Sequence, residues 1–183
     1  SSFPFSPTDG QKKAIVEILK DFEKPHPIYR LLEGDVGSGK TAVAAATAYA
    51  AATSRPKNKK GVIQDFGRLQ VAYLCPTEIL AKQHFKTFTD FFIDHPIQIG
   101  LITGSGCYKF PSKVNKREAT PISRSQFLKW VANGEIPIVI GTHALIQKAV
   151  QFKHLAYAII DEQHRFGTMQ RKELVTKGAV QPH

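Results

Sequence analysis

The sequence is poor in cysteine, in long apolar runs and in acidic side chains. Two cysteines, Cys75 and Cys107, stand among 183 residues. They are too few for a disulfide framework, so we expect a reducing, cytoplasmic location. No stretch reaches the ~20 consecutive apolar residues of a membrane-spanning helix, so no membrane partner is expected. Acidic residues number 15 against 25 Lys and Arg, a formal net charge of +10, which favours a polyanionic partner or a merely soluble basic surface.

The rest of the composition is that of a globular protein. Hydrophobic residues make up 42% of the chain and charged residues 22%, and the length suits one domain with a full core. The chain opens Ser-Ser-Phe-Pro, without a methionine and without a secretory signal. We therefore expect it to be a piece of a longer protein.

The most specific motif runs from Gly34 to Thr41 and reads Gly-Asp-Val-Gly-Ser-Gly-Lys-Thr. It matches the phosphate-binding loop at every fixed position. Its glycines let backbone N–H groups turn toward phosphates, Lys40 supplies a charge between the outer phosphates, and the Thr41 hydroxyl can ligate Mg²⁺. A strand-like run at 28–32 precedes the loop and an alanine-rich helical run at 41–53 follows it. The motif predicts a nucleoside triphosphate site.

A second acidic motif, Asp161-Glu162-Gln163-His164, follows an apolar run. Adjacent carboxylates at the end of a buried strand are costly unless a cation lies beside them. A bound Mg²⁺ removes this cost, because Asp161 then holds the metal in its outer coordination shell while Glu162 orients and deprotonates the water that attacks the γ-phosphate. Together with Lys40 and Thr41, this pair favours hydrolysis of the nucleotide.

Helical and strand-like patterns alternate along the chain. We predict helices over 8–24, 41–53, 77–92 and 126–132, and strands over 28–32, 69–75, 97–102, 136–140 and 155–160. The phenylalanines at 85, 88, 91 and 92 recur at helical spacing and are predicted core. The polar, basic segments 54–68 and 106–124 are predicted as loops, the second with room for a short helix. The alternation predicts a three-layer α/β fold with a mainly parallel sheet of at least five strands and helices on both faces.

Polar residues follow several of these strands, and ligands of open parallel sheets bind at the carboxyl ends of strands. Thr77, Glu78 and Gln83 therefore point to a functional edge, although Thr77 can also cap its helix. The turn Thr103-Gly104-Ser105 can bind phosphate oxygens through N–H and O–H donors, or it can be only a turn. His143 follows the run 136–140, and without further context its residue type favours a capping or turn histidine.

Gln11 has two interpretations from its spacing. It lies three residues after Thr8, the expected N-cap of the helix 8–24, and can complete a capping box. Its amide also presents a donor and an acceptor together, which matches the N6/N7 edge of adenine. Spacing alone leaves both open.

These motifs, in this order, resemble the first motor domain of superfamily-2 helicases. The longer strings LLEGDVGSGKT, PTEILAKQH, LITGS, GTHALIQ and IIDEQHRFG are very similar to the RecG family of bacterial DNA helicases, and the resemblance covers the chain from Phe5 onward. The related transcription-repair coupling factors read Asp-Glu-Glu-His, so Gln163 favours the RecG family. The loops 54–68 and 106–124 are longer than the family leads us to expect.

The resemblance implies a RecA-like P-loop domain of an ATP-dependent DNA helicase that acts on stalled replication forks and branched DNA in recombination and repair. ATP and Mg²⁺ are the implied cofactors, with the metal at Thr41 and Asp161 and adenine read by Gln11. The implied phosphate-loop contacts are Gly37, Ser38, Gly39, Lys40 and Thr41. The implied DNA-lining residues are Pro76, Thr77, Gln83, Thr103, Gly104, Ser105, Thr142 and His143. The residues implied to couple ATP state to DNA movement are His164, Arg165, Phe166, Gln170 and Arg171.

Members of this family continue beyond the equivalent of residues 180–183 into a second motor domain, and carry an amino-terminal wedge domain that engages branched DNA. We expect residues 1–183 to be the first motor domain alone, with those two domains as its partners, and expect little ATP hydrolysis from the chain by itself. Two alternatives remain from the sequence. One is an RNA helicase or another duplex translocase of the superfamily, and the other is a non-catalytic, nucleotide-dependent binding module.

Overall fold

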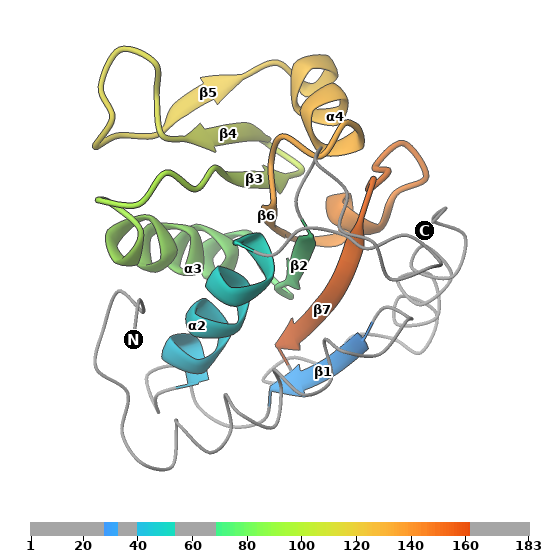
Figure 1. Ribbon diagram of the computed structural model, residues 1–183. Coiled ribbons are helices and arrows are strands. Elements are labelled where there is room, and N and C mark those ends of the chain that lie inside the picture. The colour runs from blue at the N-terminus through green and yellow to red at the C-terminus, as the bar shows by residue number, and fades with distance from the viewer. Residues whose placement is uncertain (1–27, 33–39, 54–68, 162–183) are drawn as a thin grey trace, which may run out of the picture.

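The computed structural model describes residues 28–32, 40–53 and 69–161 (Figure 1). The predicted helix 8–24, the predicted loop 54–68 and all residues after 161 lie outside these ranges. The described elements, in chain order, are β1 (Ile28–Leu32), α2 (Lys40–Ala52), β2 (Gln70–Leu74), α3 (Glu78–Phe91), β3 (Ile99–Thr103), β4 (Gly106–Phe110), β5 (Thr120–Ile122), α4 (Arg124–Ala132), β6 (Ile138–Gly141), the 3₁₀ helix η1 (His143–Ile146) and β7 (Leu155–Asp161).

The strands form one sheet of order β1-β7-β2-β6-β3-β4-β5. The five strands from β1 to β3 in this order are parallel to their neighbours, whereas β4 and β5 are antiparallel additions at one side. Parallel neighbours need crossover connections, which α2, α3 and α4 supply. The mainly parallel sheet predicted from the sequence is confirmed.

Alternate side chains of the parallel strands β2, β3, β6 and β7 enter two separate cores. In β2, Val71 and Tyr73 pack in the cluster that includes α2 and α3, whereas Ala72 and Leu74 pack in the cluster that includes α4 and η1. All residues of β2 and β3 are buried, as expected for strands whose two faces are both covered. The domain therefore has three layers, with helices on both faces of the sheet (Figure 1).

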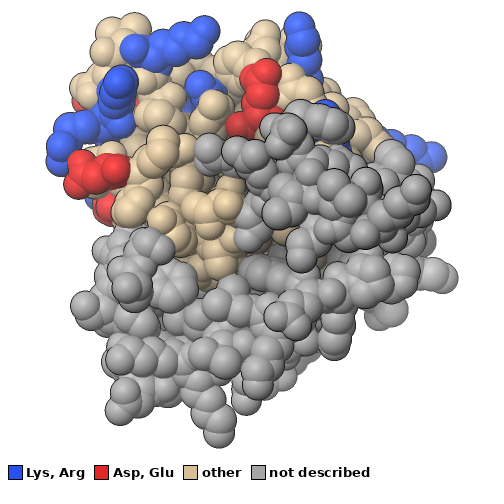
Figure 2. Space-filling model, viewed as in Figure 1, with Lys and Arg blue, Asp and Glu red and all other residues tan. Residues whose placement is uncertain are grey.

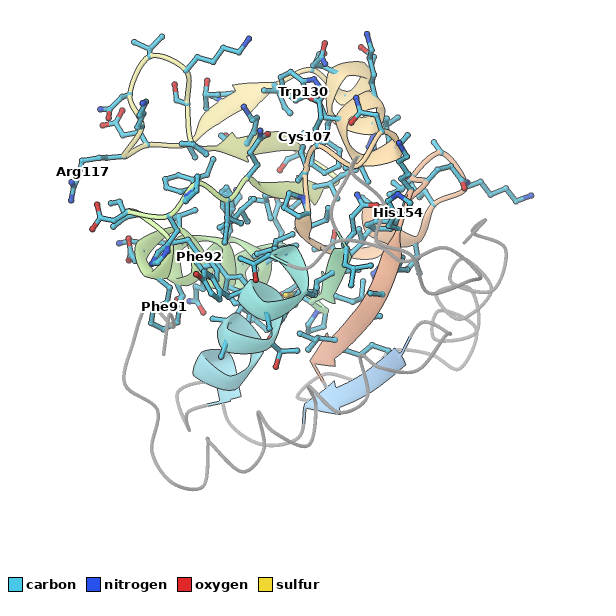
Figure 3. The ribbon with its side chains drawn as sticks, viewed as in Figure 1. Phe91, Phe92, Cys107, Arg117, Trp130 and His154 are labelled. Atoms are coloured by element: carbon cyan, nitrogen blue, oxygen red, sulfur yellow. The ribbon has the colours of Figure 1, made fainter. Side chains whose placement is uncertain are left out.

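Helices α2 and α3 pack on the same face through different side chains. The buried residues of α2 are mainly alanines, such as Ala44, Ala48 and Ala51, so little side-chain bulk separates this helix from the sheet. Helix α3 instead buries phenylalanine rings. Phe88 packs edge-on against Tyr73 of β2, with ring centroids 5.7 Å apart. The predicted core phenylalanines are buried, except that Phe91 is half-buried (Figure 3).

Gln70, the first residue of β2, is a fully buried polar side chain. Its amide nitrogen donates to the carbonyl oxygens of Val131 at 2.9 Å and Ile136 at 3.1 Å. Its amide oxygen accepts from the backbone N–H groups of Lys153 at 2.8 Å and His154 at 2.9 Å. All four hydrogen-bonding positions of the amide are therefore used, which removes the cost of burying it. The side chain joins the end of α4 to the approach to β7.

The prediction that 106–124 is a loop is wrong at both of its ends. Strand β4 pairs with β3 through the two-residue turn Gly104–Ser105, and β5 pairs with β4. The pairing places Cys107 on the side of α4, where it is buried with the apolar side chains of that helix (Figure 3), while Tyr108 on the opposite face is 38% exposed. A two-residue turn with glycine, followed by aromatic residues, was the hairpin signal in the sequence.

Lys109 interrupts the alternation of apolar and polar residues that would predict strand β4, because a lysine is rarely expected on a buried face. The residue is only 8% exposed. Its ammonium lies 4.9 Å from the ring centroid of Trp130 on α4, a cation–π contact. Burial lowers the pKa of the Lys109 amine, as does the nearby charge of Lys113, while Glu135 acts in the opposite direction.

Other element boundaries differ by small shifts. Helix α4 begins at Arg124 instead of residue 126, because the Ser123 side chain accepts a hydrogen bond from the backbone N–H of Gln126 and caps it. Strands β3 and β6 begin two residues later than predicted, and η1 was not predicted. Thr77 caps α3 as predicted, since its hydroxyl accepts from the backbone N–H of Leu80 at 3.2 Å.

Candidate functional site

The nucleotide half of the predicted site adjoins the carboxyl ends of β1 and β7. These strands are parallel neighbours, and Leu32, the last residue of β1, is in register with Asp161, the last residue of β7. In the sequence, the phosphate-loop motif begins two residues after Leu32; helix α2 begins at Lys40 and packs against β7. The sheet thus brings the strand end that precedes the phosphate-loop motif and the first residue of the acidic motif to one edge, although about 120 positions separate Lys40 from Asp161 along the chain.

Most side chains of the predicted nucleotide site lie outside the described part of the structure. Lys40, Thr41 and Asp161 are described only by their backbone positions at the start of α2 and the end of β7. The remaining predicted members fall outside the described ranges and stay predictions: Gln11, Gly37, Ser38, Gly39, Glu162, His164, Arg165, Phe166, Gln170 and Arg171. Within the described ranges, no three His, Cys, Asp or Glu side chains are grouped as a metal site.

The predicted DNA-lining residues follow the carboxyl ends of β2, β6 and β3, which are neighbours in the sheet. Backbone hydrogen bonds join these ends beyond the strands themselves. The N–H of Cys75 donates to the carbonyl of Gly141 at 2.8 Å, and the N–H of Thr142 donates to the carbonyl of Ile102 at 3.2 Å. Thr77, Thr142 and the turn after Thr103 are therefore held in one row along the edge of the sheet at which β1 and β7 also end.

The exposure of these predicted residues differs. Thr77, Gln83, Gly104, Ser105 and His143 are exposed, while Pro76 and Thr142 are half-buried. Thr103 is only 3% exposed. Its hydroxyl faces the protein, so a direct contact of this side chain with DNA would require the turn to move.

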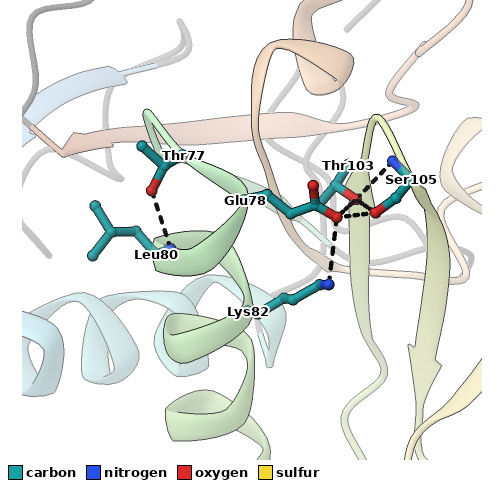
Figure 4. A network of polar contacts seen from close by, with 6 residues as sticks. All are labelled: Thr77, Glu78, Leu80, Lys82, Thr103 and Ser105. Carbon is teal, nitrogen blue, oxygen red and sulfur yellow. Dashed lines mark hydrogen bonds and ion pairs between the residues drawn. The ribbon is translucent and has the colours of Figure 1, made fainter.

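A polar network joins the turn after β3 to the first turn of α3 (Figure 4). Oε1 of Glu78 accepts a hydrogen bond from the Thr103 hydroxyl at 3.1 Å and another from the Ser105 hydroxyl. The Lys82 ammonium lies 3.4 Å from the same oxygen. The backbone N–H of Ser105 also donates to the Thr103 hydroxyl oxygen at 3.3 Å. One carboxylate oxygen thus joins two predicted DNA-lining segments.

The position of Glu78 after the second predicted strand predicts a place at the functional edge, but the sequence does not indicate its partners. The signal available was an acid in the first helical turn after a strand, with Lys82 four residues later. Nothing local in the sequence indicates that Thr103 and Ser105, more than 20 positions away, complete the network.

Arg124 is a second residue at this edge that the sequence did not single out. Its Nη2 donates to the side-chain oxygen of Gln147 at 3.3 Å, which links the start of α4 to the segment after η1. Arg124 also lies close enough to Cys107 to oppose the effect of burial, which raises the pKa of that thiol. Lys and Arg side chains are spread over the upper part of the face in Figure 2, with carboxylates among them.

No helix in the described ranges is both long enough and apolar enough to span a membrane.

The chain is similar to known proteins in both sequence and fold. Residues 8–181 match the family model of the DEAD/DEAH box helicases. A curated relative from Aquifex aeolicus, an ATP-dependent DNA helicase RecG, is 45% identical over 98% of this chain and 20% of its own length. The Bacillus subtilis relative of the same name is 43% identical over 97% of this chain and 22% of its own length. This chain therefore spans about a fifth of the length of these relatives.

Solved structures agree with the sequence comparisons. A structure of RecG bound to a three-way DNA junction superposes with a TM-score of 0.61 and 38% identity, over 91% of this chain and 19% of that chain. A hypothetical ATP-dependent RNA helicase from Sulfolobus tokodaii superposes with a TM-score of 0.52 and 14% identity, over 97% of this chain and 52% of that one, which shows the fold alone. The predicted resemblance to RecG and the predicted RecA-like fold are confirmed. The chain belongs to the DEAD/DEAH box helicase family.

Proposed function

We propose that this chain is the first motor domain of an ATP-dependent DNA helicase that remodels stalled forks and branched junctions in recombination and repair. It acts together with a second motor domain and a wedge domain of the same protein. The names of the similar curated proteins support this proposal. The observation that carries it is the common edge, where the ends of β1 and β7 adjoin the predicted nucleotide residues and the ends of β2, β6 and β3 carry the predicted DNA-lining residues.

In the nucleotide half, backbone N–H groups of Gly37, Ser38 and Gly39 bind phosphate oxygens. Helix α2 begins at Lys40, so the positive end of its dipole favours the same anion. Lys40 neutralises the outer phosphates, and the Gln11 amide binds the adenine edge.

The hydroxyl of Thr41 and the carboxylate of Asp161 fit Mg²⁺, which prefers oxygen ligands and keeps several of its waters. Their backbone positions support this pairing, because α2 packs against the strand that Asp161 ends. Bound Mg²⁺ supplies positive charge that polarises the γ-phosphoryl group. Glu162, the next residue, orients the attacking water and accepts its proton.

In the nucleic-acid half, Pro76, Thr77, Gln83, Thr142 and His143 contact the sugar-phosphate backbone. The turn from Thr103 to Ser105 contributes through its exposed part. Contacts of this kind are independent of sequence and weaken as salt rises, and the net charge of +10 supports them. His164, Arg165, Phe166, Gln170 and Arg171 connect the acidic motif to the nucleic-acid edge, and so couple hydrolysis to movement.

ATP hydrolysis by the complete natural protein that carries these 183 residues tests the proposal. We expect forked DNA to stimulate hydrolysis more than plain duplex or RNA does. Glu162→Gln should lower the turnover number by about 100-fold or more, because the general base is lost. Glu118→Gln is the matched control and should leave turnover unchanged. Glu118 is exposed and lies between β4 and β5, at the end of the sheet opposite the carboxyl ends of the parallel strands.

The two alternatives predict different outcomes. Stimulation by RNA in preference to DNA would support the RNA helicase instead. Hydrolysis that is unaffected by Glu162→Gln, or undetectable in the complete protein with every nucleic acid, would support a nucleotide-dependent binding module.

A further inference from the structure

The hydroxyl groups of the turn after β3 are occupied within the domain. A hydroxyl carries a single proton to donate. Thr103 and Ser105 both donate theirs to Oε1 of Glu78, and the N–H of Ser105 is directed at the Thr103 hydroxyl oxygen. The turn therefore does not offer these donors to a phosphate in the arrangement seen here. What it offers to the outside is the backbone at Gly104, which is exposed and has no atom within 4 Å of the place a Cβ would take.

We propose that Glu78 is a positioning residue for nucleic-acid binding. By accepting both hydroxyl protons, it fastens the turn after β3 to the first turn of α3, so that two contact segments from separate parts of the chain keep a fixed spacing. Thr103 acts as the buried anchor, and the exposed backbone at Gly104 faces the phosphate. This inference rests on the proposed function.

The charges in the network determine where a phosphate can approach. The Glu78 carboxylate lies in the first turn of α3, where the helix dipole stabilises it. The Lys82 ammonium, with about half of its side chain exposed, is drawn to the same place by the 3.4 Å ion pair. Lys82 retains donors beyond the one directed at Glu78, because an ammonium has three. The network thus holds a cation beside the carboxylate that binds the Thr103 and Ser105 hydroxyls.

Removing the Glu78 carboxylate should change DNA affinity in the direction opposite to that expected from the loss of a negative charge alone. Deleting a carboxylate near a nucleic-acid surface should tighten binding through electrostatics alone. Deleting Glu78 should weaken binding instead, because the turn loses its anchor. Asp90 supplies the comparison, since it is an exposed carboxylate near the other end of α3.

The experiment measures binding of fluorescently labelled forked DNA to the complete natural protein, by anisotropy at low and moderate salt. We expect Glu78→Ala to weaken binding by about fivefold. Glu78→Gln should stay near wild type, because its amide oxygen can still accept both hydroxyl protons. Asp90→Ala should bind as wild type or slightly tighter. Thermal unfolding midpoints of all variants report whether the fold is kept.

Ser105→Ala supplies a variant without any change of charge. It should weaken binding in the same direction, and combining it with Glu78→Ala should add less than the sum of the two effects, because both remove one contact. If Glu78→Ala lowers the unfolding midpoint, the DNA affinities of Ser105→Ala and Glu78→Gln test instead whether the Glu78 contact positions the turn.

Two outcomes would overturn the inference in different ways. If Glu78→Ala and Ser105→Ala bind forked DNA as tightly as Asp90→Ala does, Glu78 does not position the turn, while the proposed function stands. If wild type neither binds DNA nor hydrolyses ATP in its presence, the proposed function fails and the inference fails with it.

Discussion

Strand β2 has a polar side chain at its start and another just beyond its end, and the two behave differently. Gln70 at the amino end is fully buried and uses all four hydrogen-bonding positions of its amide within the protein. Glu78, beyond the carboxyl end, has a side chain 39% exposed, and its three side-chain and ion-pair contacts converge on one oxygen. At the covered end of the strand only a satisfied group is tolerated. At the carboxyl end, where parallel sheets bind ligands, partly solvated polar groups persist.

The largest effect expected from this comparison is on Gln70. Gln70→Leu keeps the approximate volume but removes the side-chain partner of two carbonyls and two N–H groups, of which the Val131 carbonyl keeps a bond from the Gly134 N–H at 3.2 Å. We expect a loss of roughly 3 to 5 kcal/mol in the free energy of unfolding, measured by urea denaturation. Gln151→Leu is the control, because Gln151 is exposed and donates only to the carbonyl of Lys148; its effect should stay within about 0.5 kcal/mol. Equal stability of the two variants would contradict a structural role for Gln70.

A second prediction compares two glycines near the candidate edge. A Cβ at Gly141 would lie 2.7 Å from the carbonyl oxygen of Ile102 and 3.0 Å from Cβ of Leu145, whereas a Cβ at Gly104 would meet nothing within 4 Å. Gly141→Ala should therefore cost about 2 kcal/mol in unfolding free energy, while Gly104→Ala should leave it nearly unchanged. A methyl group at position 104 should weaken DNA binding. Chemical denaturation and anisotropy on both variants test this, and a large stability loss for Gly104→Ala would count against the open position of the turn.

A third prediction compares two helix caps of similar geometry. Thr77 caps α3 and Ser123 caps α4, each by accepting a bond from a backbone N–H at 3.2 Å. Replacing either by alanine should cost about 1 kcal/mol. Only Thr77→Ala should also weaken binding of forked DNA, because only Thr77 belongs to the predicted DNA-lining row. Weakening by both variants to the same degree would mean that stability, not position, accounts for the effect.

The smallest expected effect is a pH dependence that arises beside Gln70. Burial holds the pKa of His154 below 6.5, and the charge of Lys153 lowers it further. The unfolded chain therefore takes up this proton at a higher pH than the folded chain does. The contribution to stability is full above pH 6.5 and is lost as pH falls from 6.5 to the lowered folded value. His154→Gln should reduce this decline, measured by unfolding free energies from about pH 8 to about pH 5; an unchanged slope would contradict the prediction.

The sequence predicted most of the parallel core. Runs such as 69–75 are apolar on both faces, a pattern that belongs to strands covered on both sides, and the phenylalanine spacing of α3 identified a core helix. The antiparallel addition was missed because Lys109 breaks the apolar alternation and its burial depends on Trp130 in another element. The turn Thr103-Gly104-Ser105, for which the sequence leaves phosphate binding and a simple turn open, is the turn of a hairpin.

The candidate site also has a part that the sequence predicts and a part that it does not. The phosphate loop and the acidic pair are short sequence motifs, and their residue types indicate their chemistry without a structure. Their partners are not local. The commitment of the Thr103 and Ser105 hydroxyls to Glu78 changes what the turn can offer to a phosphate, and that pairing depends on α3 packing beside β3.

The sequence by itself determined the family, the succession of strands and helices along the chain in the parallel core, and the residue types available for phosphate and metal chemistry. These follow from short-range patterns of glycine, apolar and charged residues. Only the tertiary structure decided that Leu32 and Asp161 are register partners, that Gln70 closes the amino end of the sheet, and that Glu78 holds the turn after β3. The physical reason is that strand order and helix packing bring together groups far apart along the chain, and no local pattern encodes which of them meet.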